Sequence, residues 1–246
     1  MRIAVIGAGV MGSGIAQVLA QTGHDVVCTD VDAAALDKAR ANVTTGRYGV
    51  DRAVERGKLS RADADATLAR LRFGTDLAAA VADVALVIEC VPERLDLKVK
   101  VFRELDRLAP ADCVLASNSS GFPLAALAAA TDRPSRVLVW HWASPPVVMK
   151  FAEIVVLPST DEDAIARVRE LAAACGKHPV VVKDQPMAWG YVANRIYAAM
   201  LVEAGRVVAE GVASHEEVNR LMVDCFGWPV GPFAMVKGAQ TGFGDA

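Results

Sequence analysis

The sequence predicts an α/β fold, with a doubly wound, mostly parallel sheet that carries a helical-pair insertion and is followed by a small all-α C-terminal domain. Three observations support this prediction. Short apolar segments alternate with helical segments up to about residue 184. Regularly spaced glycines interrupt the first apolar segment. Beyond residue 185 the pattern is helical, so we expect domains at 1–184 and 185–246.

The chain begins with a buried strand at residues 3–6, and a helical segment starts just after the glycines that follow it. A glycine-rich turn can serve packing alone, but between a strand and a helix it can also bind a diphosphate. The first glycine permits the tight turn, the second lets the backbone approach a pyrophosphate, and the third lets helix and strand pack closely. We therefore expect a Rossmann-type dinucleotide site formed by the backbone of Gly7, Gly9, Val10, Met11 and Gly12.

The second predicted strand, residues 24–30, ends in a carboxylate. Asp30 lies at about the distance from the glycines at which such sites bind the adenosine ribose hydroxyls. Asp32 follows and no arginine stands beside them, so a 2′-phosphate would meet negative charge. This favours NAD over NADP. In the alternative interpretation, Asp30 only caps the next helix.

The composition excludes several classes of protein. A net charge of −3 and the absence of a long basic run argue against nucleic-acid binding, so we expect small-molecule partners. The five cysteines are odd in number and far apart, which predicts neither disulfides nor a metal site. Neither a signal-peptide pattern nor a membrane-spanning apolar stretch is found, so we expect a cytoplasmic protein without a membrane contact.

A helical insertion is predicted after the second strand. One long helix is expected to end at Gly57, and a second, capped by Ser60, to run through Leu71. The segment from Lys38 to Arg72 holds nine basic and four acidic residues. Such an excess suits an anionic substrate tail, although for any single residue a solvated helical face is the better explanation.

The remaining elements resume the alternation. We expect strands at 84–91, 113–116, 136–140, 153–157 and 179–183, and helices at 95–108, 161–175, 194–210 and 215–226. Ser214 opens the last helix with a capping box.

His141 is the histidine best placed for catalysis, because it follows a predicted strand where the chain leaves the sheet. Ligands of open α/β sheets bind beyond the carboxyl ends of the strands. An imidazole there can accept a proton from a substrate hydroxyl if a carboxylate fixes its tautomer. Glu153 begins the next strand and can return beside His141, which predicts a His-Glu dyad.

Several motifs together give the chain a resemblance to the 3-hydroxyacyl-CoA dehydrogenases, including the 3-hydroxybutyryl-CoA members. The match runs from residue 1 to about 236, with the motifs Gly7-x-Gly-x-x-Gly12, Glu89-Cys-Val-Pro-Glu93, Ser117-Asn-Ser-Ser120, His141 before Pro145, Val148-Met-Lys-Phe-Ala-Glu153 and Gly227-Trp-Pro-Val-Gly-Pro-Phe233.

The resemblance implies a role for each matching residue. His141 would be the general base for the 3-hydroxyl and Glu153 would orient it, while Ser120 and Asn194 would bind the reacting oxygen. Glu93, Lys98, Ser120 and Ser144 would lie near the cofactor. The helical insertion, with Arg47 and Arg52, would bind the CoA moiety, and the second domain would close the cleft and form a homodimer.

The chain departs from the family pattern in three places. Trp142, Ala143 and Ser144 replace two aromatics and an asparagine, Met187–Trp189 are additional, and the C-terminal domain is shorter. The resulting expectation is an NAD-dependent oxidoreductase of fatty acid metabolism that acts on a 3-hydroxyacyl thioester. Three alternatives stay open: a dehydrogenase of a free hydroxy or sugar acid, one of a carrier-protein-bound acyl group, and a weakly catalytic NAD-binding relative.

Overall fold

The computed structural model describes residues 1–185 and 189–236. Within the first of these ranges the strands form one eight-stranded sheet in the order β3-β2-β1-β4-β5-β6-β7-β8. All neighbouring strands are parallel except β6 and β7, so the predicted doubly wound, mostly parallel sheet is confirmed. The strands are β1 Arg2–Ile6, β2 Asp25–Thr29, β3 Leu71–Gly74, β4 Leu86–Glu89, β5 Val114–Ser117, β6 Val137–Trp142, β7 Phe151–Val156 and β8 His178–Lys183.

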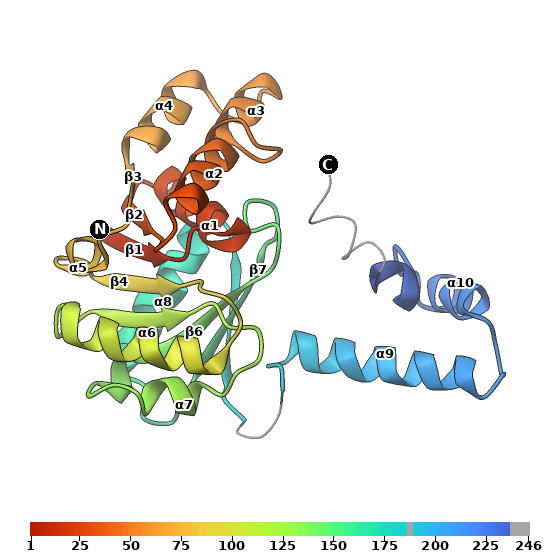
Figure 1. Ribbon diagram of the computed structural model, residues 1–246. Helices are drawn as coiled ribbons and strands as arrows, with labels where there is room; N and C mark the ends of the chain where they lie inside the picture. Colours follow the sequence, from red (N-terminus) through yellow and green to blue (C-terminus); the bar gives the residue numbers. More distant parts are fainter. Residues whose placement is uncertain (186–188, 237–246) are drawn as a thin grey trace. The chain divides into compact units, whose positions relative to one another are not determined.

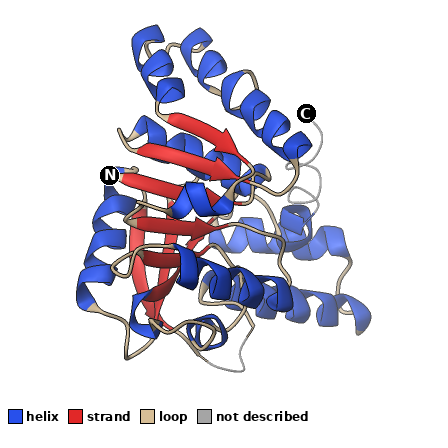
Figure 2. Ribbon diagram, turned by 60° about the vertical axis from the view of Figure 1, so that its left-hand side comes forward, coloured by secondary structure: helices blue, strands red, loops and turns tan. Residues whose placement is uncertain are grey.

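Helices cover both faces of the sheet. On one face, α1 (Val10–Gln21), α2 (Ala33–Thr44) and α8 (Glu162–Ala174) contribute to the main hydrophobic core. The other face carries α5 (Leu77–Val81), α6 (Leu95–Leu108) and α7 (Leu124–Ala128). In Figure 1, α6 and α7 lie in front of the sheet and α8 behind it, and Figure 2 shows the strands between the helical layers.

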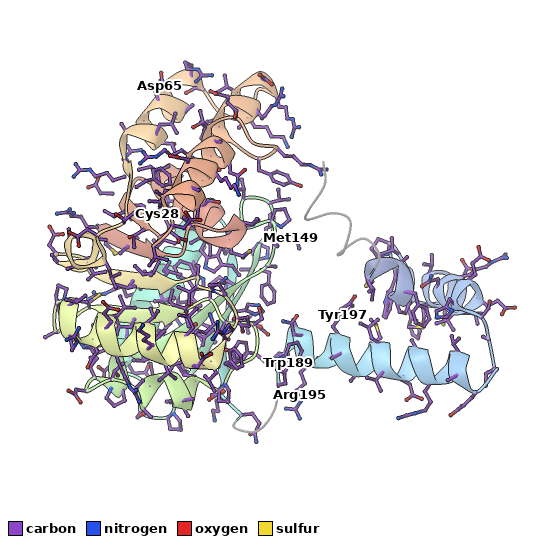
Figure 3. All side chains as sticks on the ribbon, in the orientation of Figure 1. Cys28, Asp65, Met149, Trp189, Arg195 and Tyr197 are labelled. Carbon is purple, nitrogen blue, oxygen red and sulfur yellow. The ribbon has the colours of Figure 1, made fainter. Side chains whose placement is uncertain are left out.

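The strands form the core because apolar residues occupy both of their faces. On β1, Ile3 and Val5 pack into the core cluster that contains α1, and Ala4 between them is equally buried. Cys28 on β2, labelled in Figure 3, belongs to the same core. Burial raises the pKa of the Cys28 thiol to about 12, so this side chain is an apolar core residue at neutral pH.

The helical insertion between β2 and β3 differs from the prediction. The expected long helix is two helices, α2 and α3 (Val50–Glu55), separated by a turn that contains Gly46 and Gly49. A Cβ at either glycine would lie 2.5 to 2.6 Å from a carbonyl oxygen of the preceding helical turn. The prediction was wrong here because the apolar spacing continues across the turn, whereas the backbone requires glycine at both positions.

The third strand was missed. The helix that Ser60 caps, α4 (Arg61–Ala69), ends before Leu71, and Leu71 begins β3 beside β2. Only the short sequence Leu-Arg-Phe-Gly forms this strand, and it is partly exposed at the edge of the sheet. A segment this short, directly after a helix, shows no alternation long enough to identify it. The one-turn helix α5 was also missed.

The chain divides into two compact units, Met1–Trp189 and Gly190–Ala246. The second unit contains α9 (Ala193–Ala209) and α10 (His215–Phe226), and the predicted capping box of Ser214 and Glu217 is present. Most of the Met187–Trp189 insertion and the last ten residues lie outside the described residues. None of the described helices has the length and apolarity that crossing a membrane requires.

Candidate active site

The topology brings most of the proposed site residues of the first unit to one edge of the sheet. The strand order changes direction between β1 and β4, and ligands of such sheets bind at this switch, beyond the carboxyl ends of the strands. The turn after β1, the loops after β4 and β5, and the end of β6 all reach this edge. Because β7 is antiparallel to β6, its beginning lies there as well.

The glycine turn has the geometry that a diphosphate needs. Gly7 has φ of +100°, and a Cβ at Gly12 would lie 1.8 Å from the carbonyl oxygen of Gly7. Gly9 is the N-cap of α1 and offers no side-chain acceptor to the first-turn N–H groups. A Cβ at Gly9 would meet nothing within 4 Å, so open space lies at this helix N-terminus. The residues present therefore fit a bound diphosphate.

Asp30 lies immediately after β2 and holds the glycine turn. Its Oδ2 accepts a hydrogen bond from Ala8 N at 2.7 Å, and its Oδ1 accepts one from Asp32 N at 3.0 Å. Each carboxylate oxygen retains a second lone pair for a ribose hydroxyl. The helix cap is Asp32, whose side chain accepts from Ala34 N, so Asp30 does not cap α2.

A cavity of about 630 Å³ begins at this turn. Its walls come from the ends of β1, β2 and β4, the start of α5 and one face of α6, and most of the lining side chains are apolar. Five of the predicted cofactor residues line it: Gly7, Gly9, Val10, Met11 and Asp30. Its volume suits an organic ligand such as a nucleotide.

A buried ionic network lies beside the cavity. Lys98, which is 1% exposed, lies 2.8 Å from Glu89 Oε1 and 3.2 Å from Glu93 Oε2. Burial lowers the pKa of Lys98, but attraction and hydrogen bonding to Glu89 outweigh it, so the net pKa is raised. Burial likewise raises the pKa of Glu89, against the opposing effect of Lys98. The two buried groups compensate each other because the Lys98 amino group lies within hydrogen-bond distance of the Glu89 carboxyl.

The network continues into the Ser117-Asn-Ser-Ser120 turn at the end of β5. Ser117 Oγ donates to Glu89 Oε2 at 2.6 Å, and Glu93 Oε1 accepts from both Ser119 Oγ and Ser120 N. Asn118 Oδ1 accepts from the backbone N of Trp142 at 2.9 Å. Lys98 and Glu93 are thus brought together with the Ser120 turn, and Asn118 joins this turn to the end of β6.

His141 and Glu153 form a close pair in the structure. The two residues are directly opposed in the β6–β7 register, and His141 Nδ1 lies 2.9 Å from Glu153 Oε2. Both side chains are buried, and the His141 ring contacts Phe151 edge-on. His141 lies within β6 and does not follow it as predicted, because the strand extends two residues further, through Trp142.

The loop between β6 and β7 is held by a buried lysine. Lys177 Nζ donates to the carbonyl oxygens of Pro146 and Met149 at 2.5 and 2.7 Å and lies 4.8 Å from the centre of the Trp142 ring. Ser144 and Met149, the latter labelled in Figure 3, belong to this loop. The lysine thus satisfies two carbonyl oxygens of the loop that the sheet does not pair.

The remaining candidates come from other parts of the chain. Arg52 Nη1 is 2.7 Å from Glu55 Oε2, and the Arg47 guanidinium lies over the ring of Tyr48. Both arginines belong to the helical insertion. Asn194 lies in the first turn of α9, in the second unit. The substrate contacts of these three residues stay predictions.

Sequence reasoning did not assign roles to Glu89, Ser117, Asn118 and Lys177. The sequence did contain one indication of a role for two of them: Glu89 and Ser117 are polar residues at the ends of otherwise apolar strands. Such residues are buried only when they are paired. The described residues contain no cluster of three or more His, Cys, Asp or Glu side chains arranged for a metal ion.

Comparisons with known proteins identify the family. Residues 2–185 match the model of the 3-hydroxyacyl-CoA dehydrogenase NAD-binding domain, and residues 190–244 match that of the C-terminal domain. The 3-hydroxybutyryl-CoA dehydrogenase of Mycobacterium tuberculosis is 39% identical over 240 residues, which cover 95% of this chain and 80% of that protein. Human mitochondrial hydroxyacyl-coenzyme A dehydrogenase is 35% identical over 96% of this chain and 74% of its own length.

A solved structure supports the same assignment. The (S)-3-hydroxybutyryl-CoA dehydrogenase from Ralstonia eutropha superposes with a TM-score of 0.90 at 36% identity, over 95% of this chain and 80% of that one. Both the sequence motifs and the fold thus match across nearly the whole chain. The chain therefore belongs to the 3-hydroxyacyl-CoA dehydrogenase family and is an NAD-dependent oxidoreductase.

Proposed function

We propose that the protein interconverts a 3-hydroxyacyl thioester, carried on CoA, and the corresponding 3-ketoacyl thioester. The observation that carries this proposal is the His141–Glu153 pair at the sheet edge that also holds the glycine turn. An acid/base pair beside a dinucleotide site is what reversible oxidation of a secondary alcohol needs, because a proton and a hydride leave neighbouring atoms.

The cofactor is held by the residues of the β1–α1 turn and their neighbours. Gly9, Val10 and Met11 bind the diphosphate through backbone N–H groups, and Asp30 accepts from the adenosine ribose. The predicted nicotinamide side is formed by Glu93, Lys98, Ser120 and Ser144. Bound NAD supplies the hydride acceptor for oxidation and, in reduced form, the hydride donor for reduction.

His141 moves the proton. Glu153 is an acceptor, so the Nδ1 atom of the neutral imidazole carries the hydrogen and Nε2 presents its lone pair. In oxidation Nε2 accepts the proton of the 3-hydroxyl, and the Glu153 carboxylate stabilises the imidazolium that forms. In reduction the imidazolium returns this proton to the developing alkoxide.

The other predicted residues orient the substrate. Ser120 and Asn194 hydrogen-bond the reacting oxygen, so that it faces His141. Arg47 and Arg52 attract the phosphates of CoA, and the basic excess between Lys38 and Arg72 supports this role. The cytoplasmic location and the homodimer expected from the sequence stay predictions, and sedimentation of the purified protein tests the dimer.

A panel of substrates tests the proposal. NADH oxidation by the purified protein is followed with acetoacetyl-CoA, a carrier-protein-bound 3-ketoacyl group and free acetoacetate. The proposal predicts turnover with the CoA thioester and little with the free acid. Activity confined to free acids would contradict it, and a preference for the carrier-protein thioester would correct the carrier.

A further inference from the structure

The far end of the nucleotide cavity contains a carboxylate that the dinucleotide motif does not explain. Glu104 lines the cavity together with Leu97 and Val101, which precede it by seven and three positions on α6. This spacing places all three on one face of the helix. A rise of 1.5 Å per residue places Glu104 about 10 Å beyond Leu97 along the α6 axis.

Charge in this cavity is confined to two carboxylates. Of the described residues that line it, only Asp30 and Glu104 are charged, and most of the rest are apolar, among them Val31, Ala35, Leu77 and Val101. Asp30 is engaged by the backbone of Ala8 and Asp32. In residues 1–185 and 189–236 Glu104 has neither a hydrogen bond nor an ion pair. Lys100 and Arg107 stand four positions before and three after it, where helical ion pairs form, yet neither pairs with it.

The order of groups in a dinucleotide determines which part of the ligand lies near Glu104. The diphosphate binds at the Gly9 end and the adenosine ribose at Asp30, so the base extends past Asp30 into the apolar end of the cavity. A flat aromatic base packs well against aliphatic side chains. A carboxylate is an acceptor only, so it needs a donor from the ligand.

We infer that Glu104 is a specificity-determining residue that accepts a hydrogen bond from the 6-amino group of adenine. This amino group is the only donor on the free edges of the adenine base. A 6-oxopurine such as hypoxanthine presents a carbonyl oxygen at the same position, which a carboxylate repels. Glu104 therefore selects adenine dinucleotides over 6-oxopurine dinucleotides.

Direct binding measurements test this inference without any acyl substrate. The dissociation constants of NAD⁺ and of nicotinamide hypoxanthine dinucleotide are measured by calorimetry for the wild-type protein, Glu104→Gln and Glu170→Gln. Glu170 is an exposed residue of α8 that does not line the cavity, so its variant is the matched control for removing one negative charge.

The wild-type protein and the control are expected to bind NAD⁺ about tenfold more tightly than the hypoxanthine analogue. A tenfold ratio corresponds to the lower end of the free energies of hydrogen bonds to charged groups. We expect the lower end because N1–H of hypoxanthine can still donate to the Glu104 carboxylate. In Glu104→Gln the ratio is expected to fall to about one, since an amide accepts from an amino group and donates to a carbonyl.

Two results would overturn the inference: equal wild-type affinity for both dinucleotides, or an unchanged ratio in Glu104→Gln. The inference rests on dinucleotide binding at the Gly7–Gly12 turn and not on the acyl substrate. Failure of the wild-type protein to bind either dinucleotide would instead overturn the site itself, and lack of thioester turnover with selective NAD⁺ binding would overturn only the proposed reaction.

Discussion

His141 and Glu153 face each other across the one antiparallel strand pair of the sheet, with His141 Nδ1 2.9 Å from Glu153 Oε2. The antiparallel pairing matters because it returns the chain to the edge where the parallel strands end. A parallel β7 would begin at the opposite edge, far from the glycine turn. The reversal of strand direction thus brings the carboxylate to the histidine.

Replacing Glu153 with glutamine is expected to lower kcat for acetoacetyl-CoA reduction by roughly 10-fold or more, because the imidazolium loses its negative partner and its fixed tautomer. The KM for NADH should stay near the wild-type value, since Glu153 does not line the nucleotide cavity. Steady-state kinetics on both substrates measure the two effects. An unchanged kcat would show that Glu153 has no part in the proton transfer.

Two glycine variants separate binding from folding. Gly9→Ala adds a methyl group to open space at an allowed φ of −67°, so the melting temperature should hold while NAD⁺ binding weakens by about tenfold or more, ~1.4 kcal/mol. Gly12→Ala places a Cβ against the Gly7 carbonyl and should lower the free energy of unfolding by roughly 1–3 kcal/mol. Calorimetry and urea denaturation of the two proteins provide the comparison. Equal stability of the two variants would contradict the packing role of Gly12.

Lys98→Met is expected to lower the free energy of unfolding by about 3–5 kcal/mol at pH 8, because it leaves the Glu89 carboxylate buried without its cation. The pKa of Glu89 is already raised by burial and rises further when Lys98 is lost. An acid whose pKa is raised in the folded state binds its proton more tightly there than in the unfolded chain. The fold is therefore most stable at pH values below the ordinary pKa of 4.5, and it loses stability as the pH increases above that value. The loss should therefore be smaller at pH 5 than at pH 8.

The double variant Lys98→Met, Glu89→Gln is the control for this pair. Without the buried charge, it should recover part of the lost stability and most of the pH dependence should disappear. Urea denaturation at the two pH values measures all three proteins. A loss of stability that is the same at pH 5 and pH 8 would contradict the role of the uncompensated carboxylate.

Local patterns in the sequence were sufficient for most elements and for the glycine turn. Helix α6 and the capping box of Ser214 have the predicted residues, because helix limits depend on nearby residues. The break at Gly46 and Gly49 and the strand β3 were not predicted, because the first depends on backbone contacts and the second on pairing with β2. The first is a local feature of the backbone and the second a tertiary one, and apolar spacing encodes neither.

The catalytic pair of the site could be predicted from the sequence, whereas the buried ionic network beside it could not. His141 and Glu153 could be paired in advance because only a short, proline-bearing loop separates the end of one predicted strand from the start of the next. The burial of Lys98 between Glu89 and Glu93 could not, because a helical lysine is ordinarily exposed. The unpaired carboxylate of Glu104 is likewise visible only once α6 lies along the cavity.

The most direct test of the central claim compares His141→Gln with the wild-type protein in NADH oxidation by saturating acetoacetyl-CoA. If His141 supplies the proton, the wild-type protein turns over and kcat of the variant falls by roughly 10² to 10⁴, with the dissociation constant of NADH unchanged. Equal turnover by the two proteins would contradict the account.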